Sequence, residues 1–325
     1  LQEEITTPGE GQIRALFTSA GNPVLSTPNG LALGNALQDL DFMLSMDIYI
    51  NESTQHADLI LPPASFLTQP HYDSVFNAFA VRKVARLNLP LWQRNEHERA
   101  DWEIVNGIGK AYAKAAGKPW QDLPPPNTLI AMGLANGKTG LTYADLEGAE
   151  HGIDLGPLQP SLLDRLQTES GMIEAAPALF MQALQALPIP QPEATDTCLR
   201  LIGRRDIRSN NSWMHNAPRL VKGKTRHHLL MHDNDLSARG LKDGELVRVR
   251  SSTGEIRVEV KASVTVMPGV VCLPHGFGHQ GQGLRLQHAA AVAGPSYNDL
   301  TDAAALDGPS GNAALNGLEV WVEAI

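Results

Sequence analysis

The stretch Phe42-Met-Leu-Ser-Met-Asp-Ile-Tyr-Ile50 decides the fold class, together with the residues that follow it, Asn51-Glu-Ser-Thr54 and Asp58-Leu-Ile-Leu61. Two short apolar runs, bounded by polar residues and by Pro62, are typical of β-strands. We therefore predict one strand at residues 42–50 and a second at residues 58–61.

The segments on either side extend this pattern to an α/β domain. Residues 13–17 form another short apolar run, which ends at the turn Gly21-Asn22-Pro23. Apolar residues recur at the spacing of one helix face in residues 29–40 and again in residues 100–116. Strands separated by helices predict a Rossmann-like parallel sheet with crossover helices.

After residue 195 the pattern changes to short strands with Gly and Pro between them. The turn Ser251-Ser-Thr-Gly254 separates two alternating runs, as in a β-hairpin. Such a succession predicts a barrel or a sandwich. The strands that we predict here are residues 198–202, 246–250, 255–260, 270–273 and 318–322.

We expect three parts along the chain. Residues 1–120 are predicted to form an α/β cofactor-binding domain, and residues 193–325 a β-barrel. The residues between them, 121–192, are rich in Gly and Pro, which indicates an irregular, partly helical connecting segment with a helix at residues 160–167.

Composition narrows the class of partner. The 325 residues carry a net charge of −9, which argues against a nucleic-acid partner and against an anionic membrane surface. No apolar run approaches the roughly 20 residues that span a bilayer, so membrane insertion is not expected. Leu1 is not a methionine and no signal segment follows it, so we expect a piece cut from a longer polypeptide.

The cysteines are Cys198 and Cys272 alone. Two thiols cannot form a four-cysteine iron–sulfur cluster or an all-thiolate zinc site. Both have apolar neighbours, so we interpret them as buried, inert thiols. So few cysteines suit a reducing compartment, and we expect a cytoplasmic location, with the periplasm as the alternative.

Two further features resemble chemical motifs but are not expected to act as such. Gly133-Leu-Ala-Asn-Gly137 has three residues between its glycines, where a phosphate loop needs four. Five histidines fit no metal-ligand spacing, and we interpret them as surface or loop residues: His227, His228, His232, His275 and His279.

Two strand ends carry candidate binding residues. Open α/β sheets bind ligands at the carboxyl ends of their strands, and N–H groups at helix N-termini favour pyrophosphate, so the Gly21-Asn22-Pro23 turn is a candidate phosphate loop. The carboxylate of Asp47, near the end of its strand, can accept the paired N–H donors of guanine. The alternatives are an ordinary strand–helix turn at residues 21–23 and an acid that caps a turn at Asp47.

A basic segment is the third candidate. Residues 198–228 hold eight Lys or Arg and one acid, a local net charge of +7. Arg forks with Asn, Ser, Trp and His suit a flat ligand that carries phosphates. The alternative is a solvated basic face, which would not need the Trp and the paired Asn. The central part of the segment reads Gly203-Arg-Arg-Asp-Ile-Arg-Ser-Asn-Asn-Ser-Trp-Met-His-Asn216.

In this order, the three candidates resemble the molybdopterin oxidoreductases, the dimethyl sulfoxide reductase superfamily that includes formate dehydrogenases and nitrate reductases. Residues 47–62 look like the family block D-x-x-x-x-E-T-x-x-x-A-D-x-x-L-P, with Asp47 at the guanine-reading position and Ser53 in place of the Thr. Residues 98–104 are similar to the motif that opens the next helix. Residues 199–325, with Asn298-Asp-Leu-Thr301, look like the C-terminal double-psi β-barrel of the family.

Two departures from the family pattern stand out. Gln69-Pro-His-Tyr-Asp73 occupies the place of the family's E-x-x-G, which indicates a divergent branch. The family's N-terminal half has no counterpart in this chain. That half contains the Cys, selenocysteine or Ser that binds the metal and, where present, the iron–sulfur motif.

The resemblance implies binding of bis-molybdopterin guanine dinucleotide with Mo or W, as part of an oxidoreductase whose remaining domains and electron-transfer partner lie outside this chain. An iron–sulfur cluster would belong only to the missing half. No catalytic residue and no metal ligand is assigned here, so we expect the isolated chain to be inactive. The residues implied to contact the cofactor are Gly21, Asn22, Pro23, Asp47, Ser53, Thr54, Arg204, Arg208, Asn211, Ser212, Trp213, His215 and Asn298.

Two other functions stay open. The chain could be a stand-alone, non-catalytic cofactor-binding subunit of a larger redox complex. It could also be an ordinary nucleotide-binding enzyme with an accessory barrel, although the sequence lacks the G-x-G-x-x-G fingerprint of that class.

Overall fold

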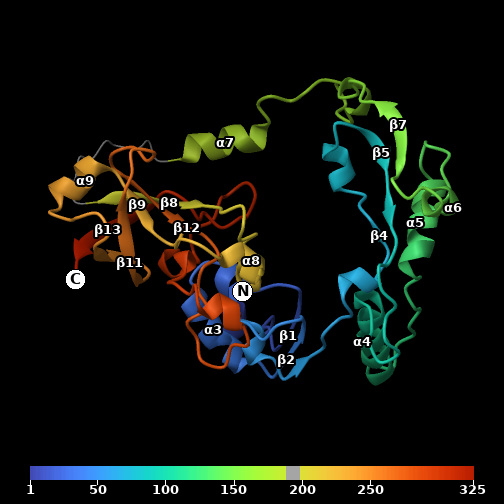
Figure 1. The fold of residues 1–325 in the computed structure, drawn as a ribbon, viewed down its shortest axis with the longest axis horizontal. Coiled ribbons are helices and arrows are strands. Elements are labelled where there is room, and N and C mark those ends of the chain that lie inside the picture. The colour runs from blue at the N-terminus through green and yellow to red at the C-terminus, as the bar shows by residue number, and fades with distance from the viewer. Residues whose placement is uncertain (188–197) are drawn as a thin grey trace. The chain divides into compact units, whose positions relative to one another are not determined.

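The computed structural model describes residues 1–187 and 198–325, which form two compact units. The first unit combines Leu1–Ile60 with Ala176–Ile325, and the second is Leu61–Ala175 (Figure 1). The units do not follow the predicted domain boundaries, because residues 61–120 group with the connecting segment and not with residues 1–60. The end of that predicted segment and the start of the predicted barrel domain, residues 188–197, lie outside the described residues.

A three-stranded parallel sheet of order β1-β2-β3 begins the first unit. The apolar side chains of Ile5, Leu33 and Met43 form its core together with neighbouring residues. Because β1 and β2 pair in parallel from Ala15↔Phe42 to Ser19↔Met46, their carboxyl ends lie at one edge of the sheet. The elements are α1 (Gln2–Thr6), β1 (Ala15–Ser19), α2 (Pro23–Ser26), α3 (Gly30–Ala36), η1 (Leu37–Asp39), β2 (Phe42–Met46), η2 (Thr54–His56) and β3 (Leu59–Ile60).

The parallel sheet confirms the α/β prediction, with shorter elements than the sequence indicated. The strand predicted to reach residue 50 ends at Met46, because the carboxylate of Asp47 accepts a hydrogen bond from the backbone N–H of Tyr49 and starts a turn. The helix predicted over residues 29–40 becomes a 3-10 turn after Ala36.

The second half of the first unit is a closed barrel of strand order β10-β11-β9-β12-β8-β13. Alternate side chains point inward: in β11, Ile256, Val258 and Val260 are buried between exposed neighbours. The predicted β-hairpin is present as the antiparallel pair β10–β11. Barrel strands are β8 (Leu199–Arg204), β9 (Leu229–Met231), β10 (Leu246–Arg250), β11 (Glu255–Ala262), β12 (Val270–Pro274) and β13 (Leu318–Ala324).

Short helices lie before and between these strands. The helices of this half are α7 (Ala178–Ala186), η6 (Trp213–Asn216), α8 (Pro218–Val221), α9 (Asp233–Ala238), α10 (Gln287–Ala290) and η7 (Tyr297–Leu300). Throughout the part of the chain that the structure describes, no helix is both long and apolar enough to cross a bilayer.

The second unit contains two small antiparallel sheets, β4-β6 and β5-β7, and helices. Its small core includes Ala85, Leu87, Leu134 and Leu146. The predicted helix over residues 100–116 is confirmed as α4. The elements are η3 (Phe66–Thr68), β4 (His71–Tyr72), η4 (Phe76–Phe79), β5 (Arg82–Ala85), β6 (Leu87–Asn88), α4 (Asp101–Ala115), α5 (Pro126–Ala135), α6 (Tyr143–Glu147), β7 (Ile153–Pro157) and η5 (Leu163–Arg165).

The predicted helix at residues 160–167 is wrong. Only the 3-10 turn η5 forms there. Leu162 and Leu163 are 63% and 76% exposed, so the apolar residues that suggested a helix face have no core to pack against.

Candidate functional site

The turn after β1 and the turn after β2 are held together by side-chain hydrogen bonds. The Asn22 amide donates to Glu52 Oε2 at 2.8 Å and accepts from the Ser53 hydroxyl at 2.7 Å. The same hydroxyl accepts from the backbone N–H of Val24 at 3.0 Å. Asn22 also begins α2, with Pro23 at the first helical position. The predicted Gly21-Asn22-Pro23 loop is therefore a well-ordered turn at the carboxyl edge of the sheet.

Ser53 and Thr54 are fully buried, and their hydroxyls bond inside the protein. The Thr54 hydroxyl donates to the Tyr49 carbonyl at 2.9 Å and accepts from the Asn51 N–H at 2.8 Å. Both residues were predicted as cofactor contacts from the sequence. Their position in the structure makes them supports of the loop that follows Asp47.

Asp47 lies immediately beyond β2, half-buried. Its carboxylate accepts from the backbone N–H of Tyr49 and from the Asn51 amide, both at 3.1 Å. Burial raises the pKa of Asp47 above its ordinary value, and these hydrogen bonds offset part of that rise. The carboxylate therefore caps a turn at the end of β2, and its predicted contact with guanine stays a prediction.

A chain of buried side chains connects this edge of the sheet to the barrel. Glu52 Oε1 accepts from the backbone N–H of His279 at 2.7 Å and lies 2.9 Å from His279 Nδ1. The other ring nitrogen of His279, Nε2, lies 2.9 Å from His215 Nδ1. These three residues are 8%, 4% and 3% exposed.

His279 and His227 lie in loops, as predicted, but neither is at the surface, since both side chains are buried. The rings of His215 and His227 lie against Phe277, with centroid distances of 4.5 and 4.4 Å. Sequence reasoning missed Glu52, His279 and His227 as members of the site. The one local signal was the glycine-rich loop around His279, which allows the backbone to pack closely.

Asn298 lies fully buried in η7, against the turn that follows β1. Its side-chain amide donates to the Leu25 carbonyl at 2.8 Å, and its backbone carbonyl accepts from the Asn29 N–H at 2.9 Å. The structure thus places Asn298 of the barrel against α2, the short helix that follows the Asn22 turn.

The basic segment is partly buried and partly exposed. The Arg204 guanidinium donates to the Arg226 carbonyl at 3.0 Å, whereas Arg208 is exposed and Trp213 is 60% exposed. Asn211 has a left-handed backbone with φ of 59°, and Ser212 precedes η6. The segment therefore offers both a solvated basic face and, through His215, a buried end.

Five buried side-chain atoms of this unit have no hydrogen-bond partner among the described residues, and three of them belong to the site residues described above: His215 Nε2, His227 Nε2 and Asn298 Oδ1. Buried polar groups of a folded protein are normally paired, so each such atom needs an explanation. A ligand that brings N–H donors would satisfy them, and a pterin or a guanine carries such donors.

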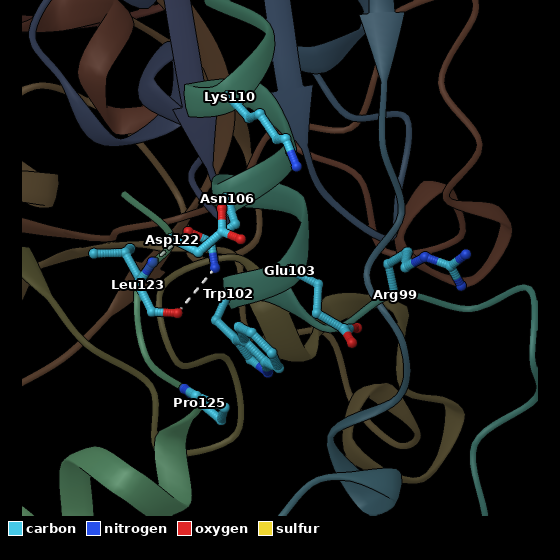
Figure 2. Close-up of a pocket in the computed structure, with 9 residues that line it drawn as sticks. Arg99, Trp102, Glu103, Asn106, Lys110, Asp122, Leu123 and Pro125 are labelled. Carbon is cyan, nitrogen blue, oxygen red and sulfur yellow. Dashed lines mark hydrogen bonds between the residues drawn. The ribbon is translucent and has the colours of Figure 1, made fainter. Parts of the chain in front are cut away.

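A separate pocket of about 490 Å³ lies in the second unit (Figure 2). Figure 2 shows the hydrogen bond between the Asn106 amide and the Leu123 carbonyl, 3.1 Å long, which closes one side of it. The Glu103 carboxylate is held by Arg94 and by the Ala100 N–H. The lining residues are Arg99, Trp102, Glu103, Asn106, Gly107, Lys110, Asp122, Leu123 and Pro125. No residue predicted to contact the cofactor is among them.

Comparison with known proteins gives two family matches. Residues 1–111 match the molybdopterin oxidoreductase family, and residues 199–319 match the Molydopterin dinucleotide binding domain. The assimilatory nitrate reductase catalytic subunit of Bacillus subtilis is 24% identical over 274 residues, which are 82% of this chain and 38% of that protein. The F420-dependent formate dehydrogenase 1 subunit alpha of Methanococcus maripaludis is 24% identical over 276 residues, 82% of this chain and 39% of that protein.

The fold agrees with a solved structure as well. Acetylene hydratase from Pelobacter acetylenicus superposes with a TM-score of 0.74 at 18% identity, over 100% of this chain and 46% of that one. This chain therefore spans less than half the length of the proteins that it matches. With both family matches in the predicted order, the chain belongs to the molybdopterin oxidoreductase family.

Proposed function

We propose that this chain holds the guanine dinucleotide form of the molybdopterin cofactor within a larger Mo- or W-dependent oxidoreductase. The observation that carries the proposal is the hydrogen bond from Asn298 of the barrel to Leu25 of α2, the helix after the Asn22 turn, beside buried polar atoms that lack partners. When bound, the cofactor supplies the two-electron redox chemistry, and the protein supplies binding, orientation and electrostatics.

The residues divide into three roles in this proposal. Gly21, Asn22 and Pro23 form the turn at the guanine arm, Asp47 reads the guanine, and Ser53 and Thr54 keep that loop in shape. The pterin rings meet His215 and Asn298. The phosphates meet the basic segment at Arg204, Arg208, Asn211, Ser212 and Trp213. The barrel that closes over the cofactor has, in this proposal, the double-psi topology of the family.

The remaining parts of the enzyme are proposed to lie in polypeptide that this chain does not contain. Its relatives are more than twice as long, and two cysteines cannot hold an iron–sulfur cluster. We assign the metal ligand, any cluster and the contact with an electron-transfer partner to that polypeptide. The isolated chain is then inactive, and in the cell the whole enzyme is cytoplasmic.

The second unit offers a surface for that further polypeptide. Several large apolar side chains are exposed over residues 66–92 and do not belong to the small core of this unit. Exposed apolar groups of this size mark interfaces in folded proteins. The exposed side chains are Phe66 (80%), Phe76 (70%), Phe79 (80%), Val81 (91%), Leu91 (72%) and Trp92 (61%).

Replacement of Asp47 tests the guanine site directly. Asp47→Asn keeps an oxygen for the Tyr49 N–H but removes one of the two carboxylate acceptors that guanine requires. We expect binding of GMP, measured by calorimetry, to weaken by about 1–3 kcal/mol. Asp41→Asn is the matched control, because Asp41 pairs with exposed Arg14 near the opposite end of β2.

Unchanged affinity of Asp47→Asn for GMP would remove Asp47 from the site. Tighter binding of AMP than of GMP by the unmodified chain would favour the alternative of an ordinary nucleotide-binding enzyme.

A further inference from the structure

The buried chain from Glu52 through His279 to His215 determines where the imidazole protons lie. Glu52 Oε1 receives the backbone N–H of His279 and also faces its Nδ1, at 2.7 and 2.9 Å. An ionised carboxylate only accepts hydrogen bonds, so His279 Nδ1 carries a proton. In a neutral imidazole the other nitrogen, Nε2, then has only a lone pair.

This lone pair decides the state of His215. His279 Nε2 lies 2.9 Å from His215 Nδ1, so His215 must supply the proton of that bond. A neutral His215 with its proton on Nδ1 has an unprotonated Nε2. That atom is the buried acceptor without a partner.

The surroundings of Glu52 and His215 keep the carboxylate ionised and the imidazole neutral. Burial raises the pKa of Glu52, but the hydrogen bonds that its carboxylate accepts from the His279 ring and the Asn22 amide outweigh burial and bring the pKa below its ordinary value. Burial lowers the pKa of His215 to about 4, while the charges of Asp206 and Glu52 act in the opposite direction.

The neighbouring His227 has the same arrangement, with one ring nitrogen that donates a hydrogen bond and one that can accept. Its pKa is lowered to about 4 by burial first and then by His228, Arg204 and His215, and it bonds to the Pro295 backbone. A ring that donates to that carbonyl through one nitrogen leaves the other, the unpartnered Nε2, as an acceptor.

The backbone at His279 supports a role beyond packing. His279 has a φ of +67°, a left-handed conformation that residues other than glycine rarely adopt. Both its N–H and its ring bond to Glu52, which holds the strained residue in place. Strain maintained by surrounding contacts is typical of functional sites.

We propose that Glu52 and His279 are positioning residues that hold His215 as its Nδ1–H tautomer, so that His215 Nε2 accepts a hydrogen bond from an N–H donor of a planar heteroaromatic ligand. Only the identity of that ligand rests on the proposed function. A proton that enters at Nε2 moves the Nδ1 proton to His279, where the Glu52 carboxylate balances the charge.

The tautomer is testable without cofactor, by NMR of the full chain with ¹⁵N-labelled histidine. The resonances of His215 are assigned by their loss in His215→Gln. We expect Nδ1 of His215 to carry the proton and Nε2 to stay unprotonated down to about pH 4. A proton on Nε2 at neutral pH in the unmodified chain would overturn the proposal, whatever the variants do.

His279→Asn tests the positioning role. Asn tolerates the left-handed backbone and retains the N–H that bonds to Glu52, but it cannot reach His215. We expect His215 to change from one tautomer to a mixture of both. His275→Asn, in the same loop but outside the hydrogen-bonded chain, should leave the tautomer unchanged. A single unaltered tautomer in His279→Asn would refute the role of His279.

The ligand class is tested separately with free pterin added in excess. Binding through His215 should shift the Nε2 resonance of His215 in the unmodified chain. The shift should be smaller in His279→Asn. If the tautomer is as expected but pterin causes no shift, the ligand assignment fails while GMP binding at Asp47 remains an independent test of the proposed function.

Discussion

The carboxyl of Asp299 should make the chain less stable as the pH rises. It lies next to the N-terminus of α3, where the backbone N–H of Leu31 bonds to it and a Cβ on Gly30 would be 3.4 Å from its Oδ1. Burial raises the pKa of Asp299 from 3.8 to about 6, although the Leu31 bond acts in the opposite direction.

The sign follows from proton binding. The unfolded chain releases this proton near pH 3.8 and the folded chain near pH 6. Between these values the folded chain binds more protons, so the free energy of unfolding falls as the pH rises. The penalty is absent below both pKa values and complete above both.

The size of the penalty follows from the same two values. The difference between 3.8 and about 6 corresponds to about 3 kcal/mol, at 1.36 kcal/mol for each pH unit. Solvent reaches part of the carboxyl, and the N–H groups at the start of α3 favour an anion, so we expect about 1–2 kcal/mol. Asp299→Asn keeps an acceptor for Leu31 and should remove this penalty.

Thermal unfolding of the full chain, at several values between about pH 4 and pH 8, measures the effect. The melting temperature of Asp299→Asn should exceed that of the unmodified chain by roughly 2–8 °C at pH 8, and the gain should vanish towards pH 4. Asp39→Asn, an exposed position in the same unit, is the control. A gain independent of pH, or a loss at pH 8, would refute the reasoning.

Two further predictions concern packing. Gly30→Ala should lower the free energy of unfolding by about 1–3 kcal/mol, because its Cβ would lie 2.1 Å from the Val24 carbonyl oxygen. Gly34→Ala in the same helix is the control: its Cβ would have 3.9 Å of clearance, so this variant should be neutral or stabilising. Equal denaturant midpoints of the two variants would contradict the prediction. The native chain should bind the dye ANS at its exposed apolar side chains, and Phe76→Ser with Phe79→Ser should reduce the fluorescence; an unchanged signal would exclude these residues from that surface.

The class of the fold could be predicted from sequence because it depends on local periodicity. Alternation along Leu246–Arg250 and Glu255–Ala262, with a Gly turn between them, predicts a β-hairpin from local sequence alone. The prediction of a helix at residues 160–167 was wrong because local sequence is not sufficient for a helix to form. Its apolar spacing was suitable, but a helix also needs a surface to pack against, and none is close to Leu162 or Leu163.

The residues of the candidate site could likewise be predicted from sequence only in part. Asn22 and Asp47 could be placed at strand ends from the order of runs and turns, since parallel strands end at one edge of the sheet. Glu52 and His279 are 227 positions apart, and no local pattern records that they meet. Burial of their side chains comes from packing between the sheet and the barrel.

The amino-acid sequence alone thus predicted the α/β sheet, the β-hairpin and the residues at strand ends, because each depends on neighbours within a few positions, whereas the choice of a barrel over a sandwich came from the family resemblance. Only the tertiary structure decided that residues 61–120 belong with the second unit, that His279 and His227 are buried, and that polar atoms of His215, His227 and Asn298 lack partners. The physical reason is that burial and hydrogen-bond pairing are properties of contacts between distant segments, which form only when the chain is folded.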